Sequence, residues 1–161
     1  EDFRDRLVPY LHKAGLVPAG SFADLSTEHR ALLTAAAPLV QERMTLLGEA
    51  VGMLGFLFAA DDAVVVEDDA RAGLRDEAPA VLDAAAAALE AIPLDGFTTE
   101  ATQTALQAAL VDGLGIKPRL AYTPLRTALT GRRVSPPLFE SMEILGKAST
   151  LTRIAALRET L

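Results

Sequence analysis

The sequence predicts an all-α fold, and three observations support this class. Half of the 161 residues are hydrophobic, which is enough to bury a core without disulfides. Alanine is used heavily and β-branched residues are not, a composition that favours helix over strand. Apolar residues recur at helical spacing along most of the chain, and only Val64–Val66 is a candidate for extended structure. We therefore expect helices joined by short loops.

The first 37 residues predict two helices separated by a loop. Phe3, Leu7 and Leu11 are spaced to share one helix face, and Gly15 follows where that helix should end. Ser26 is suited to cap the next helix, because its hydroxyl can accept a bond from an unpaired backbone N–H.

Pro38 is expected to end or kink the second helix, or else to open a short one over 39–44. Thr45 should then cap a very apolar helix over 46–58. The glycines in this helix predict close packing against a neighbouring helix, and they are Gly48, Gly52 and Gly55.

Asp61-Asp62 mark a junction, and helices are expected again from about Glu67. Thr98 should cap one of them, Ser149 is a plausible cap for the last, and Gly131 and Gly146 stand where left-handed helix ends are expected. The remaining helices are predicted over 76–92, 99–114, 124–130, 136–145 and 150–161.

Charge is distributed unevenly. The net charge of −7 argues against a nucleic-acid ligand, and residues 61–100 hold 11 acidic side chains against two basic ones. Residues 113–139 instead hold five basic side chains and no acidic one: Lys117, Arg119, Arg126, Arg132 and Arg133. A local positive surface can attract RNA even on an acidic protein, although charge runs more often form solvated faces.

No catalytic or metal site is predicted. The chain has no cysteine, and neither His12 nor His29 has a second ligand at helical spacing. The first residues lack the apolar core of a secretion signal, and apolar stretches such as 51–60 fall short of the roughly 20 residues that span a membrane. Because the chain begins without Met, within an expected helix, we expect it to be a fragment.

The segment 113–146 carries the most information. Gly131 permits a sharp reversal that projects Arg132 and Arg133, and Pro136 and Pro137 stiffen the approach to the next helix. Rigid loops that carry arginine forks beside small apolar surfaces suit single-stranded RNA. A solvated basic turn, with Leu138 and Phe139 in the core, is the commoner alternative for such a segment.

Three runs within residues 113–147 resemble the C-terminal signature of bacterial glutamyl-tRNA synthetases. They are Pro124-Leu125-Arg126-Thr127-Ala128-Leu129-Thr130-Gly131, Ser135-Pro136-Pro137-Leu138-Phe139-Glu140 and Leu145-Gly146-Lys147. Weaker likeness extends over the rest of the chain, including Leu7 to Gly15 and Pro38 to Met44.

The resemblance implies two packed helical subdomains, which we place at 1–62 and 63–161. It implies binding of the anticodon loop of tRNA for glutamate, with tRNA for glutamine as a second candidate. Catalysis with ATP and Mg would lie in a separate domain of a cytoplasmic, monomeric ligase. This fragment is then expected to be inactive alone, with no cofactor and no membrane contact.

The resemblance also implies which residues bind the tRNA anticodon. They are Arg43, Arg126, Ser135, Pro136, Pro137 and Leu138. Arg43 matches a position implicated in distinguishing glutamate from glutamine anticodons, and Pro137 replaces the glycine of some relatives, so it offers no N–H. As contacts to phosphates we expect Lys117, Arg119, Arg132 and Arg133.

A second interpretation is a helical protein-interaction or regulatory module that binds an apolar partner through the helix over 46–58. Burial separates the two interpretations: an exposed 46–58 face would favour this module, and a buried one would favour RNA binding.

Overall fold

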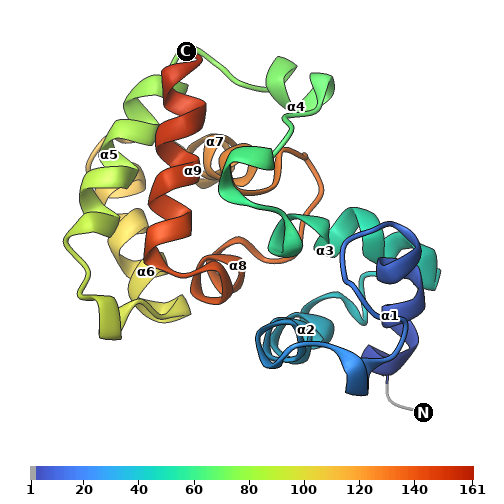
Figure 1. Ribbon diagram of the computed structural model, residues 1–161. Coiled ribbons are helices and arrows are strands. Elements are labelled where there is room, and N and C mark those ends of the chain that lie inside the picture. The colour runs from blue at the N-terminus through green and yellow to red at the C-terminus, as the bar shows by residue number, and fades with distance from the viewer. Residues whose placement is uncertain (1–2) are drawn as a thin grey trace. The chain divides into compact units, whose positions relative to one another are not determined.

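The computed structural model describes residues 3–161, and this part of the chain is helical throughout its regular structure, without a strand (Figure 1). The predicted all-α class is confirmed. The chain divides into two compact units, one that ends at Ala59 and one that begins at Ala60. Each unit has its own core and is described separately.

The described part of the first unit, residues 3–59, consists of three helices and two 3-10 turns. They are α1 (Phe3–Lys13), η1 (Phe22–Asp24), α2 (Thr27–Val40), η2 (Leu47–Glu49) and α3 (Ala50–Phe58). α1 packs on both α2 and α3, and the fully buried leucines at the centre are Leu7, Leu11, Leu33 and Leu54. The glycines do not show the predicted close helix packing: Gly48 and Gly52 are exposed, and a Cβ added at Gly48 or Gly55 would make only ordinary contact, with Tyr10 or with Leu16.

The second helix begins as predicted but ends differently. The Ser26 hydroxyl accepts a bond from the His29 amide (3.1 Å), which confirms the cap. Pro38 does not end α2, which continues to Val40, because a proline in the last turn removes only one backbone bond. The predicted helix over 39–44 is wrong: the amides of Arg43 and Met44 both donate to the Val40 carbonyl in a turn.

The apolar helix begins later than predicted. α3 starts at Ala50, and the Glu49 carboxylate accepts the amides of Thr45 (2.7 Å) and Leu46 (3.0 Å) in the turn before it. The apolar side chains of α3 point into the first unit, since Met53, Leu54, Phe56 and Leu57 are buried. This burial does not support the interaction-module interpretation, which needs that face exposed.

The second unit contains the other helices. They are η3 (Asp61–Ala63), α4 (Asp68–Ala72), α5 (Ala78–Glu90), η4 (Leu94–Gly96), α6 (Thr99–Leu106), η5 (Gln107–Asp112), α7 (Pro118–Thr130), α8 (Leu138–Leu145) and α9 (Lys147–Glu159). α5 and α9 lie side by side (Figure 1). The fully buried side chains at the centre are Leu82, Leu89, Leu106, Leu110, Leu125, Leu129, Met142 and Ile154.

Thr98 caps α6 as predicted, with its hydroxyl accepting the Ala101 amide at 3.1 Å. The helix then widens into the π-helical η5 and stops at Asp112, so the single helix predicted over 99–114 is two elements. α7 begins at Pro118, six residues before the predicted start, and Pro124 lies inside it. A first-turn proline is favourable at Pro118, because its missing N–H has no helical partner there.

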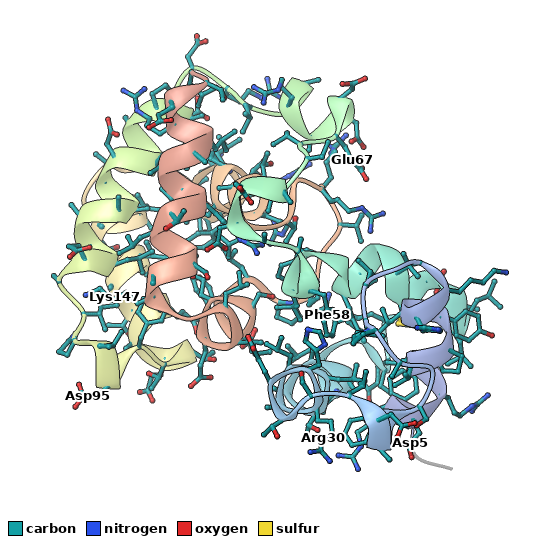
Figure 2. The ribbon with its side chains drawn as sticks, viewed as in Figure 1. Asp5, Arg30, Phe58, Glu67, Asp95 and Lys147 are labelled. Atoms are coloured by element: carbon teal, nitrogen blue, oxygen red, sulfur yellow. The ribbon has the colours of Figure 1, made fainter. Side chains whose placement is uncertain are left out.

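The last helix starts at Lys147, so Ser149 lies inside α9 and the prediction that it caps the helix is wrong. Its hydroxyl donates instead to the Asp61 carboxylate at 3.0 Å. Lys147 closes the carboxyl end of α5, where its ammonium donates to the carbonyls of Glu90 (2.8 Å) and Ile92 (2.7 Å) (Figure 2). The Leu-Gly-Lys run therefore has a structural role here.

Candidate nucleic-acid interface

The turn after α7 fixes the direction of the basic segment. Gly131 has a φ of 73° and its amide donates to the Thr127 carbonyl (2.8 Å), which confirms the predicted left-handed helix end. The Thr130 hydroxyl donates to the Arg126 carbonyl (2.8 Å) and accepts the Arg132 amide (3.1 Å). These bonds fix the backbone of Arg132 directly after the end of α7.

A segment from far earlier in the chain packs directly against this turn. A Cβ atom on Gly131 would collide with the Val65 carbonyl oxygen, so the close approach also requires glycine. The Glu67 amide donates to the Gly131 carbonyl (2.8 Å), and the Glu67 carboxylate accepts from Arg132 Nε (3.1 Å). Figure 2 marks Glu67 just ahead of α4. The Val64–Val66 triplet is thus a segment that packs against the turn at Gly131 and is not part of a sheet.

A cleft of about 440 Å³ lies between α7 and the connection from α4 to α5. We call it the arginine cleft. It is lined by Ala70, Gly73, Arg75, Glu77, Pro118, Arg119, Leu120, Tyr122, Thr123, Pro124, Arg126, Thr127, Arg132 and Arg133. Five of these residues are arginines and only Glu77 is acidic, in a chain whose net charge is −7. The lining therefore attracts anions on an otherwise acidic protein.

Arginines elsewhere in the second unit are bound to protein acceptors. Arg71 donates to the Thr160 hydroxyl (3.2 Å), Arg153 to the Asp61 carboxylate (2.8 Å) and Arg158 to the Asp83 carboxylate (3.0 Å). Three arginines of the cleft differ in this respect. The guanidinium groups of Arg75, Arg119 and Arg133 make no hydrogen bond or ion pair with any residue in 3–161. They are available to a ligand that presents phosphate oxygens.

The structure brings together four of the predicted site residues in the arginine cleft: Arg119, Arg126, Arg132 and Arg133. Lys117 is exposed and stands at the N-cap of α7, next to the cleft-lining Pro118. Arg43 is exposed in the first unit and follows the end of α2.

The predicted Ser135–Leu138 turn is not part of the cleft lining. The Ser135 hydroxyl donates to the Pro136 carbonyl (3.0 Å), and both residues are buried. Leu138 is 5% exposed and belongs to the core, whereas Pro137 is half-buried. The exposed part of this loop is Arg133 and Val134.

Two cleft residues were not singled out by the sequence analysis. Arg75 stands alone in an acidic run, and only its position in the fold adds it to the basic segment. Tyr122 packs edge-to-face on Phe139 (5.2 Å between centroids), and burial, aided by the negative charge of Asp112, raises the pKa of its hydroxyl. The cleft thus combines arginines with an aromatic ring, as sites for unpaired bases do.

Within residues 3–161 no group of three or more His, Asp or Glu side chains is placed to hold a metal ion. In the same range, the helices are too short or too polar to cross a bilayer.

Known proteins resemble this chain over almost its whole length. The family model described as an anticodon binding domain matches residues 2–158. The glutamate–tRNA ligase of Kocuria rhizophila is 63% identical over 161 residues, which is all of this chain and 31% of that protein. The ligase of the same name from Kineococcus radiotolerans is 65% identical over the same 161 residues, again 31% of its length.

A solved structure shows the same fold. The glutamate tRNA ligase from Elizabethkingia meningosepticum, crystallised in complex with its amino acid, superposes with a TM-score of 0.72. It is 21% identical, and the match covers 99% of this chain and 30% of that one. The chain thus spans about a third of the length of the relatives it matches.

Proposed function

This chain belongs to the anticodon binding domain family, and we propose that it is the part of a glutamate–tRNA ligase that binds the anticodon loop of tRNA. The observation that carries the proposal is the arginine cleft. It gathers Arg119, Arg126, Arg132 and Arg133, which are separated along the basic segment, around one hollow that an RNA strand can enter.

Within this proposal, positions have different roles. Arg126 contacts the anticodon bases, because it projects from a packed helix into the cleft and a guanidinium fork can pair with base edges. Lys117, Arg119, Arg132 and Arg133 contact phosphates, which are the same at every nucleotide.

The Ser135, Pro136, Pro137 and Leu138 turn contributes contacts to the central and last anticodon bases. Its buried members hold the shape of the loop. Arg43, exposed in the first unit, distinguishes glutamate from glutamine anticodons.

The whole protein would join glutamate to tRNA, which the names of the relatives support. It would use ATP and Mg in a catalytic domain outside this chain. The chain alone would then hold no cofactor and catalyse nothing. We propose tRNA for glutamate as the partner, with tRNA for glutamine as a second candidate, and a monomeric protein that acts in the cytoplasm, where tRNA is used.

The test is binding of two RNA stem-loops, one with the glutamate anticodon and one with a scrambled loop. The unmodified chain should prefer the first. Arg126→Ala should weaken binding of the first about tenfold and reduce the preference, since a base contact contributes roughly 1–3 kcal/mol.

Arg158→Ala is the matched control, because this variant removes the same charge from an arginine that is bound to Asp83 outside the cleft. A chain that binds both stem-loops equally, or neither of them, contradicts the proposed function. If Arg126→Ala and Arg158→Ala are indistinguishable, the role given to Arg126 is wrong.

A further inference from the structure

We infer that Arg75 is a further RNA-binding residue, which contacts a backbone phosphate of the strand in the arginine cleft. This inference rests on the proposed function and extends it, because Arg75 lies 42 residues before Lys117, in the acidic part of the chain. The RNA-binding surface would then include the α4–α5 connection as well as α7 and the turn after it.

The backbone around Arg75 is held on both sides. Leu74, just before it, packs partly against the core, and its amide donates to the Arg71 carbonyl at 3.1 Å. Ala78, three residues after it, is 1% exposed, and its amide donates to the Arg75 carbonyl at 3.0 Å. Arg75 itself is exposed. The backbone that carries Arg75 is therefore held at the cleft before any ligand arrives, so binding needs to order only the side chain.

The wall that carries Arg75 leaves room for a ligand. Ala70 lines it with a small side chain and Gly73 with bare backbone, while Arg119, Tyr122 and Arg126 line the cleft from α7. The volume of about 440 Å³ falls within the range of roughly 300–1,000 Å³ that small-ligand sites occupy. Part of one nucleotide can thus enter between the two walls.

The charges in the cleft favour a phosphate as the group beside Arg75. The guanidinium groups of Arg75 and Arg119 have no partner in residues 3–161 and line the same hollow, so an anion that enters it meets positive charge from both walls. Glu77 is the single carboxylate among the lining residues, and it opposes that anion. A phosphate, present at every nucleotide, satisfies the arginines without requiring a particular base.

Arg71 provides a comparison within the same short stretch. It is exposed, has the same charge and lies four residues before Arg75, but its guanidinium donates to Thr160 and it lines no part of the arginine cleft. If nonspecific attraction to positive charge explained RNA binding, the two arginines would matter equally.

The experiment measures affinity for the glutamate-anticodon stem-loop and for the scrambled stem-loop across a range of salt concentrations. Arg75→Ala should weaken binding of both by about fivefold at low salt, the effect expected for one charge pair near 4 Å in water. It should also reduce the slope of log affinity against log salt by about 0.7, the contribution of one phosphate on a single strand.

Three further variants sharpen this test. Arg71→Ala should leave the affinity and the slope unchanged. Arg75→Lys should keep the slope, because an ammonium still neutralises a phosphate. Glu77→Gln should strengthen binding of both stem-loops, because it removes the one opposing charge.

An unchanged slope in Arg75→Ala overturns the inference while leaving the proposed function in place. Equal losses in Arg71→Ala and Arg75→Ala overturn it also, as does a loss confined to the glutamate-anticodon loop, which would mean a base contact. If the unmodified chain binds neither stem-loop, the proposed function fails and this inference fails with it.

Discussion

Two groups of arginines in the second unit use the same side chain in opposite ways. On α9, Arg153 is 2% exposed and donates to the Asp61 carboxylate and the Leu129 carbonyl, both at 2.8 Å. In the arginine cleft, Arg75 and Arg119 have no such acceptor among residues 3–161. A guanidinium that is removed from water must be paired, whereas one at a cleft wall stays hydrated until a ligand replaces the water. The difference separates arginines that stabilise the fold from those that are available to bind.

The largest expected effect is on stability, and it comes from replacing Arg153, the buried arginine. Arg153→Met should lower the free energy of unfolding by about 3 kcal/mol, because it leaves the Leu129 carbonyl and part of Asp61 without their donor. Asp61 is 32% exposed, so water recovers some of the loss. Denaturant unfolding measures this change. Arg158→Met is the control and should cost under about 1 kcal/mol, since its pair with Asp83 is largely exposed. Equal losses would contradict the structural role of Arg153.

Gly131→Ala should cost about 2 kcal/mol or more, because a φ of 73° is strained for alanine and the new Cβ would meet the Val65 carbonyl. The displaced turn should also weaken stem-loop binding through Arg132. Gly115→Ala is a matched control, since Gly115 has a φ of 68° but nothing within 4 Å of an added Cβ. The difference between the two losses of unfolding free energy measures the cost of the contact between the new Cβ and the Val65 carbonyl. Equal losses would show that this contact does not destabilise the variant.

Glu67→Gln should have the smallest effect on stability, about 0.5 kcal/mol, because its pair with Arg132 is half-exposed. It should strengthen stem-loop binding by releasing Arg132 for phosphate. Asp68→Asn removes the same charge one residue later, from an exposed side chain that neither lines the cleft nor pairs with Arg132. If both variants bind RNA alike, the gain reflects net charge and not the freed arginine.

The sequence predicted helix ends best at residues whose role depends only on the adjacent backbone. Ser26 and Thr98 cap their helices, and Gly131 ends α7 in the left-handed region, because each of these depends on nearby backbone alone. α2 runs past Pro38, and Ser149 does not cap α9, for a related reason. A proline is tolerated in a last turn, and a serine hydroxyl is free to bind Asp61, far away in sequence, instead of an adjacent amide.

The residues of the candidate site also fall into two groups, those that the sequence could indicate and those that only the fold reveals. Arg126 and Arg132 could be selected from the sequence, because they lie in one basic segment with a recognisable pattern. Arg75 could not, because its neighbours in sequence are acidic and its neighbours in space are basic. Tyr122 also lacked a signal, since one aromatic ring at helical spacing is as consistent with a core position as with a site.

By itself, the sequence determined that this protein is helical, roughly where its helices lie, and which segment carries positive charge in an acidic chain. Those properties follow from backbone preferences and side-chain periodicity, which act over a few residues. Only the tertiary structure decided which arginines are paired and which are available, because that depends on the acceptors that the fold brings near each guanidinium. It placed Asp61 beside Arg153 and left Arg75 at the wall of a cleft, and no local pattern encodes either outcome.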